Sequence, residues 1–349
     1  MKCILTTIMV IGLVGFVFLL PNAGFAQSTA KQATATEPQA ELGEEEAGYS
    51  EEEYEAYDKA NKEPDLDKKL ELLNGYIAKY PKSKLMSYIT TAYENLMGEY
   101  ANGEKWDKLL PAAEGWLKTN PDSELTMKYA AAAAQKLGNH QKFLDYALKI
   151  YEKTPDGTWA YSIYEAYRNL KNEPKQLEWA EKIFSYDEFK GEFPLRMQFV
   201  DKYLKSKEYS KAADYAQKAL ASVEAAKKPD AVSAADWNKQ LRSVRRACYF
   251  TRGINYYENQ KNYEAAIKEF QNAVNVEKFS DGYYYMGHCY WKLNQLEEAI
   301  DAFGKANVLG GELADQSKEY LEKLYKSLHN NTLVGVDKVY TRAKQELGR

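Results

Sequence analysis

Few residues of this 349-residue chain are arranged for catalysis or metal binding. Its three histidines, His140, His288 and His329, are far apart, and none has a neighbour at metal-ligand spacing. The patterns G-x-G-x-x-G, G-x-x-x-x-G-K-S/T, H-E-x-x-H and G-x-S-x-G are all absent. Carboxylate pairs are inevitable among 51 acidic residues, and solvated helix faces account for them. The sequence therefore predicts a non-enzymatic protein with no catalytic residue, no metal site and no cofactor. A hydrolase with a site between repeats is the least favoured alternative.

The charge balance and the composition favour a helical protein over a nucleic-acid binder. The chain has 47 basic and 51 acidic residues, a net charge of −4, so we expect no nucleic-acid partner. Tyr is abundant at 29 residues, whereas Gly (20) and Pro (10) are modest. This composition is typical of helices with aromatic packing rather than of a turn-rich β-sandwich.

The N-terminal part of the chain, residues 1–50, predicts export. Lys2 precedes an almost wholly apolar stretch over residues 4–20, and the small residues Gly24 and Ala26 follow a Pro-Asn break. This is the pattern of a signal peptide over residues 1–26, cleaved after Ala26. An uncleaved anchor, which would bring membrane contact, is the alternative, although the stretch is short for a span. Residues 27–50, rich in Ala, Thr, Gln and Glu, predict a disordered acidic linker.

A sequence repeat is visible toward the C-terminus. Gly253 and Gly287 are 34 apart in the chain, and Phe270 and Phe303 are 33 apart, so one extra residue is expected in the turn over 259–262. The alanines that keep the same spacing are Ala266, Ala273, Ala299 and Ala306. Small residues on one helical face let two helices approach closely, and the Phe rings fill the space between them.

Prolines mark helix ends at a similar period upstream. Pro121 and Pro155 are also 34 apart, and each follows a segment with helical apolar spacing. Pro81 closes an earlier segment of the same kind. The separation of 40 between Pro81 and Pro121 predicts one longer helix in that unit.

The order G-x-x-Y, A-x-x-x-F and Pro, recurring at this period, resembles the tetratricopeptide repeat (TPR). The resemblance implies an all-α fold, a right-handed α-solenoid of about seven helix-turn-helix pairs over residues 51–311. Residues 312–349 then supply capping helices that cover the last apolar face. With the leader, the chain resembles exported bacterial TPR proteins, which implies a location in the periplasm.

In the TPR family, the first helix of each pair lines a concave face that binds partner segments. The residues that the resemblance places there are Phe250, Ile254, Tyr257, Tyr284, His288 and Trp291, with Tyr164, Tyr167 and Arg168 at similar places in the middle of the chain. Aromatic side chains of this kind often dominate binding energy. The alternative is that they are core against the next helix. Lys128 is followed one turn on by Ala132, so the Lys–Asn pair of carboxylate-clamp members is not carried over.

Two further features concern charge and cysteine. Arg242, Arg245 and Arg246 share one face of a helix in a stretch without acidic residues, which predicts a surface for an anionic partner or for the chain's own Glu-rich segment. A solvated face with scattered ion pairs is the alternative. Cys248 and Cys289 are expected on neighbouring first helices, too far apart for a disulfide, so we predict two free and mostly buried thiols.

These expectations favour an adaptor that binds protein segments in a bacterial cell envelope. The inference of an adaptor function rests on analogy with other proteins of this fold. The alternative is a helical module that binds carbohydrate or peptidoglycan through surface Tyr and Trp rings.

Overall fold

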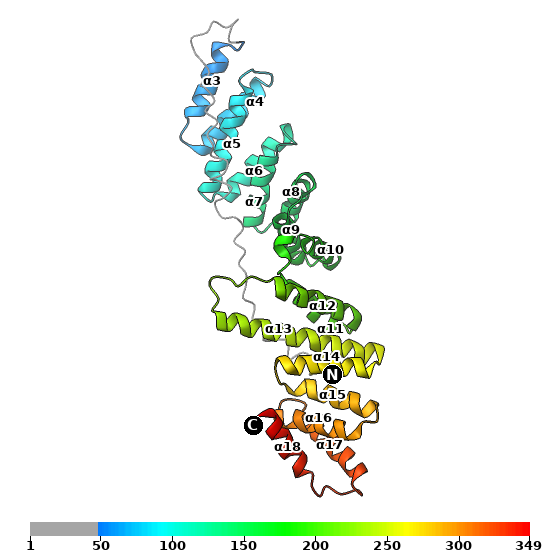
Figure 1. Ribbon diagram of the computed structural model, residues 1–349. Helices are drawn as coiled ribbons and strands as arrows, with labels where there is room; N and C mark the ends of the chain where they lie inside the picture. The colour runs from blue at the N-terminus through cyan, green and yellow to red at the C-terminus, as the bar shows by residue number, and fades with distance from the viewer. Residues whose placement is uncertain (1–47) are drawn as a thin grey trace. The chain divides into compact units, whose positions relative to one another are not determined.

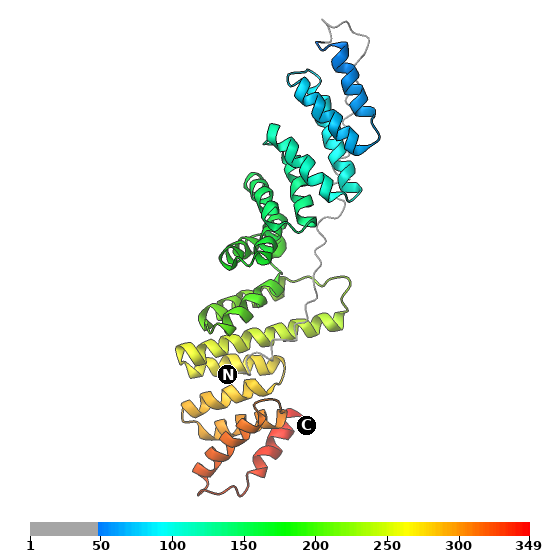
Figure 2. The ribbon, with the colours of Figure 1, turned by 180° about the vertical axis from the view of Figure 1, so that it is seen from behind.

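The computed structural model describes residues 48–349, which fall into two compact units, 48–186 and 187–349. The predicted signal peptide and residues 27–47 of the predicted linker lie outside the described residues. All regular structure in the described part is helical, and the helices of each unit follow one another as hairpins, as Figure 1 and Figure 2 show from opposite sides. None of these helices is long and apolar enough to cross a membrane.

Residues 48–186 form four helix pairs. The helices, in chain order, are α3 (Glu51–Lys62), α4 (Leu66–Lys79), α5 (Met86–Asn102), α6 (Trp106–Thr119), α7 (Glu124–Lys136), α8 (His140–Lys153), α9 (Gly157–Asn169) and α10 (Glu173–Ile183). Pro81, Pro121 and Pro155 each come two residues after a second helix, as predicted. At 17 residues, α5 is the longer helix that the spacing predicted, because α7 and α9 have 13.

Residues 187–349 form three more pairs and the C-terminal helices. These are α11 (Phe193–Lys205), α12 (Tyr209–Ala225), α13 (Ala234–Ile254), α14 (Tyr263–Val276), α15 (Ser280–Lys292), α16 (Leu296–Leu309), α17 (Ala314–Leu328) and α18 (Asp337–Leu347). A short 3-10 turn, η2 (Asp187–Phe189), and a π-helical turn, η3 (Asn255–Gln260), complete the unit. The prediction of about seven helix pairs before the capping helices is confirmed, and the described residues hold seven.

Capping side chains define where many of these helices begin. Ser50 accepts a hydrogen bond from the Glu53 amide while the Glu53 side chain accepts one from the Ser50 amide, a capping box that starts α3. Ser50 therefore belongs to the folded body, although the predicted linker ran to residue 50. Asp156 and Asn139 cap later helices without such a box, each side chain accepting a hydrogen bond from a backbone amide of the first turn.

The turn inside each pair from the second to the seventh has one backbone conformation. The residue two positions before the start of the second helix has a positive φ. These positive-φ residues are Glu104, Gly138, Lys171, Lys207, Lys261 and Asn294. Five of the six carry a side chain, although this left-handed conformation favours Gly. Because the residue type at this position varies, the positive-φ residue by itself does not predict the turn.

Glycine and phenylalanine lock pairs six and seven. A Cβ on Gly253 would lie 2.5 Å from the Phe270 ring, and a Cβ on Gly287 would lie 2.8 Å from the Phe303 ring. Both rings are buried. The predicted close approach of the two helices is therefore confirmed, with the ring of the second helix pressed against the bare backbone of the first.

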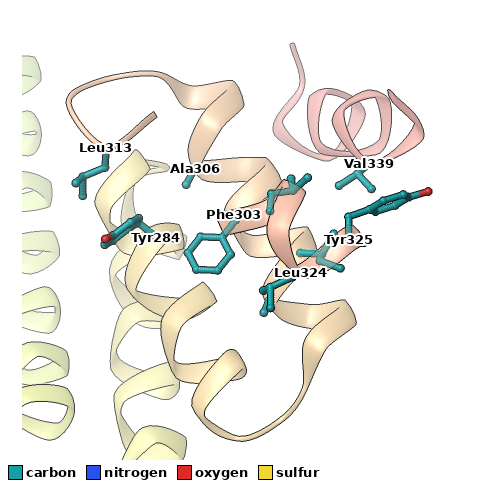
Figure 3. Close-up of a cluster of buried hydrophobic side chains, with 10 residues drawn as sticks. Tyr284, Phe303, Ala306, Leu313, Leu324, Tyr325 and Val339 are labelled. Atoms are coloured by element: carbon teal, nitrogen blue, oxygen red, sulfur yellow. The ribbon is translucent and has the colours of Figure 1, made fainter. Parts of the chain in front are cut away.

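The last helix, α18, lies along α16. Arg342 pairs with Asp301 at 3.1 Å, Glu346 pairs with Lys305 at 2.6 Å, and the Arg349 guanidinium donates to the Val308 carbonyl at 2.9 Å. The partners on α16 advance along the chain in the same order as those on α18, so the two helices run parallel. Val339 contributes to the cluster in Figure 3, where Phe303 lies between Tyr284 and Leu324.

Candidate partner-binding surface

Four of the predicted partner-binding residues are buried. Tyr164 is 1% exposed, Phe250 3% and Tyr284 8%, and Ile254 is fully buried. The expectation that they present their side chains to a partner is corrected, because neighbouring helices cover them. The Phe250 ring, for example, lies 5.5 Å from the Phe270 ring and 5.6 Å from the Tyr285 ring.

Tyr257, His288 and Trp291 are partly exposed and lie together with two residues that sequence reasoning missed. The five residues form what we call the aromatic cluster: Tyr257, Tyr285, His288, Trp291 and Tyr320. They come from η3, α15 and α17. Tyr285 stands directly after the predicted Tyr284, and its neighbourhood in the sequence could have suggested it. Tyr320 gave no signal, because its place depends on how α17 packs against the preceding pair.

Ring contacts connect the aromatic cluster from one end to the other. The Tyr257 ring centroid lies 5.5 Å from that of Tyr285 and 6.4 Å from that of His288. The His288 ring lies 4.8 Å from Tyr320 and 6.1 Å from Trp291, and Trp291 lies 5.6 Å from Tyr320. Aromatic rings in such edge and offset contacts stabilise one another and hold fixed orientations. The cluster is therefore a pre-organised surface.

A lysine lies over a ring at each end of the aromatic cluster. The Lys261 ammonium is 5.9 Å from the Tyr257 centroid, and the Lys323 ammonium is 5.5 Å from the Trp291 centroid. Cations are attracted to the negative faces of aromatic rings. The cluster thus offers aromatic area in the middle and positive charge at its two ends.

Burial changes the titration of the cluster. It lowers the pKa of His288 to about 4, with a smaller contribution from the nearby Lys292 charge. It also raises the pKa of Tyr257 to about 12. His288 is therefore neutral at neutral pH, and it contacts its aromatic neighbours as an uncharged ring.

The basic face is largely neutralised by its own neighbours. Arg245 pairs with Glu224 at 2.8 Å, and Arg246 pairs with Glu277 at 2.8 Å while lying over the Phe279 ring. Arg242 is exposed. Two of the three arginines are therefore in ion pairs, as the alternative of a solvated face with scattered ion pairs predicted. Their acidic partners lie on α12 and in the segment after α14.

Two of the three predicted residues in the N-terminal unit reach the surface. Tyr167 is partly exposed and Arg168 is exposed, and Arg168 pairs with Glu165 at 2.5 Å. Burial raises the pKa of the Glu165 and Glu94 carboxyls, which lie on α9 and α5. No hydrogen bond or ion pair joins these two carboxyls within residues 48–349, and no metal-binding group of His, Cys, Asp and Glu occurs there.

The two cysteines are free and buried, as predicted. Burial raises the pKa of each thiol to about 12, so both are protonated at neutral pH. The Cys248 sulfur lies 3.5 Å from the Met197 sulfur between α13 and α11. Both cysteines therefore serve packing.

Comparison with known proteins gives no match to a family model and none to a curated protein. Solved structures do resemble the chain. A TPR protein from Parabacteroides merdae is 17% identical, with a TM-score of 0.32, over 79% of this chain and 96% of that one. A TPR protein from Thermus thermophilus is 17% identical, with a TM-score of 0.23, over 67% and 98%. The TPR2AB domain of yeast Sti1 is 13% identical, with a TM-score of 0.32, over 84% and 97%.

With TM-scores this low, the fold class rests on the chain's own helices. They form seven TPR-like hairpins, and the same Gly–Phe contact locks pairs six and seven. The protein is an all-α array of TPR-type helix pairs.

Proposed function

We propose that this protein is a non-enzymatic adaptor that binds a segment of a partner protein on the aromatic cluster. The observation that supports this is a connected set of partly exposed rings, held in place by packing and flanked by Lys261 and Lys323. Rigid aromatic side chains lose little conformational entropy on binding, which makes them effective contact residues for polypeptides.

A polypeptide fits this surface better than a sugar. Stacking on a sugar ring needs an open aromatic face. Trp291 has the Lys323 ammonium over its ring, and the His288 ring lies 6.1 Å away in a stacked orientation. The two lysines beside the rings also suit the main-chain carbonyls of a peptide.

Site-specific crosslinking tests this function. A photoreactive amino acid replaces Trp291 in one protein and the exposed Asn95 of α5 in a control protein. We expect polypeptide adducts at position 291 that disappear when Tyr320→Ala is added, and none at position 95. Adducts with glycan alone would favour the carbohydrate-binding alternative. Turnover of a substrate by the purified protein would contradict the adaptor function.

We also propose that the protein is exported to the periplasm of a bacterial cell envelope. The support is the sequence pattern of residues 1–26, with its basic start, apolar stretch and small residues before the expected cleavage point. Cell fractionation and the mass of the mature N-terminus test this. A protein that begins at Gln27 in the periplasmic fraction is the expected result, and an intact leader in the membrane fraction would indicate an anchor.

A further inference from the structure

Two exposed leucines lie at equivalent positions of neighbouring helix pairs. Leu137 is 47% exposed and Leu170 is 41% exposed. Each directly follows the first helix of its pair, α7 or α9, and each backbone amide donates to the carbonyl four residues back at 3.0 Å. The other large apolar residues exposed to this degree between residues 48 and 349 are Leu328 and Val334.

The turn after the first helix does not require a leucine. Gly103 and Ser206 occupy the same position in pairs two and five, and φ lies between −82° and −77° at all four residues. A small or polar residue therefore forms the same turn. Leu137 and Leu170 keep more than a third of their surface in water, where apolar side chains rimmed by polar residues often mark a contact site.

A tryptophan lies next to the turn of Leu137. Trp106, the first residue of α6, is partly exposed, and the Lys136 ammonium lies 5.7 Å from its ring centroid. Every pair reverses direction at such a turn, so the turns of pairs two, three and four follow one another along one edge of residues 48–186. We call this the turn edge, and it comprises Trp106, Leu137 and Leu170 with Lys105, Lys136 and Lys171.

The turn edge is positively charged. Its three lysines are exposed, and none of them forms an ion pair within residues 48–349. Five basic and three acidic residues occur in the six-residue stretches that begin at Gly103, Leu137 and Leu170. Three basic and four acidic residues occur in the equivalent stretches of pairs five to seven, which begin at Ser206, Gln260 and Leu293. Those later turns also have no exposed large apolar residue.

An anionic lipid bilayer fits these properties. Leucine side chains enter the apolar boundary of a bilayer, tryptophan and lysine favour its headgroup region, and lysines attract anionic headgroups. The two leucines stand on separate turns, so a protein partner would need a matching socket for each. A fluid bilayer accommodates each side chain independently.

We propose that the turn edge of residues 48–186 binds the surface of an anionic lipid bilayer. Leu137 and Leu170 enter the bilayer, and the three lysines contact the headgroups. The turn edge belongs to the first unit and the aromatic cluster to the second, so this inference is independent of the proposed adaptor function.

Vesicle sedimentation tests the lipid binding. The protein used is the chain from Gln27, which keeps every described helix and lacks the apolar leader, because the leader would itself bind lipid. We expect this protein to sediment with vesicles of phosphatidylglycerol and phosphatidylethanolamine, and much less with vesicles of phosphatidylcholine.

Two double variants test the leucines. Leu137→Ser with Leu170→Ser should lower the partition coefficient at least about 10-fold, because two inserted side chains are lost. Leu328→Ser with Val334→Ser is the matched control, since it removes the other two exposed apolar side chains. The control should change the partition coefficient less than about 2-fold.

Two single variants test the charge. Lys171 and Lys207 are exposed lysines at the same positive-φ position of pairs four and five. Lys171→Glu should weaken binding to the anionic vesicles about 5-fold, because a headgroup contact becomes a repulsion. Lys207→Glu lies outside the turn edge and should weaken it less than about 2-fold.

Equal partition of the wild-type protein and the folded leucine double variant overturns the proposal. A wild-type protein that binds neither kind of vesicle also overturns it, and a photocrosslink from position 137 to a protein would then assign the edge to a protein partner. An equal loss in the Leu328/Val334 control contradicts it too. If the leucine double variant does not fold, Lys171→Glu decides, and binding equal to that of Lys207→Glu is the overturning result.

Discussion

The two units use one hairpin plan but hold it together differently. In residues 48–186, tyrosine hydroxyls cross-link helices. Tyr93 donates to Asn74 at 3.2 Å, and the hydroxyls of Tyr151 and Tyr186 share a hydrogen bond at 2.7 Å. In residues 187–349, Gly287 lets Phe303 press against the backbone, and rings contact rings over α15, α16 and α17. Rings also stack in the first unit, where the Tyr93 ring lies 4.5 Å from Trp116, so the units differ in the hydroxyl bonds that the first adds and in the Gly–Phe contacts that the second adds.

The largest effect is expected from Phe303→Ala. Phe303 is fully buried between α15 and α16, so its loss removes apolar contacts and leaves a cavity beside Gly287. We expect the free energy of unfolding of residues 187–349 to fall by about 3–5 kcal/mol, measured by chemical denaturation. Val334→Ala is the control, because Val334 is 83% exposed and its loss should cost less than about 0.5 kcal/mol. A loss below about 1 kcal/mol for Phe303→Ala would contradict the ring-on-ring lock.

The stability of the C-terminal unit should depend on pH because of His288. Its folded pKa of about 4 lies below the ordinary 6.5, so the unfolded chain binds the proton first as the pH falls. The stabilisation is complete above pH 6.5 and is lost between pH 6.5 and 4, by about 3 kcal/mol at most. His288→Phe should flatten this part of the profile in denaturation experiments. Equal slopes for the wild-type and His288→Phe proteins over this range would be inconsistent with a buried neutral imidazole.

Adding one methyl group should have opposite effects in the two units. Gly287→Ala places a Cβ against the Phe303 ring, and we expect a loss of about 1–3 kcal/mol. Gly75→Ala in α4 meets no atom within 4 Å, and we expect a gain of about 0.5–1 kcal/mol because alanine restricts the unfolded chain. Chemical denaturation of the two variants measures whether the free energy of unfolding falls in one and rises in the other. A gain in stability for both substitutions would remove the difference in packing between the units.

The smallest effect is expected from removing a tyrosine hydroxyl. Tyr93→Phe leaves the buried ring in place but removes the hydrogen bond to Asn74, so a loss of about 0.5–1.5 kcal/mol is expected. Tyr285→Phe is the counterpart in the other unit, and no hydrogen bond of its hydroxyl is found among the described residues. It should change stability by less than about 0.5 kcal/mol. Thermal unfolding of the two variants measures the two losses of stability. An equal loss in Tyr285→Phe and Tyr93→Phe would contradict the difference between the units.

The sequence by itself determined the helix pairs and their locks. Apolar spacing, Pro121 after a helix end, and glycine opposite phenylalanine are short-range rules that act within one pair, so they can be read from one stretch of chain. The free state of Cys248 and Cys289 followed from the expected geometry of neighbouring pairs.

Only the tertiary structure decided which of the aromatic residues reach the surface. Phe250 and Tyr284 have the same helical spacing as Tyr257 and Trp291, yet the first two are buried and the last two are partly exposed. Neighbours on other segments make the difference, as the Phe250 ring shows, which is surrounded by the rings of Phe270, Phe279 and Tyr285. Periodicity specifies which face of a helix a side chain occupies, whereas exposure depends on what packs against that face.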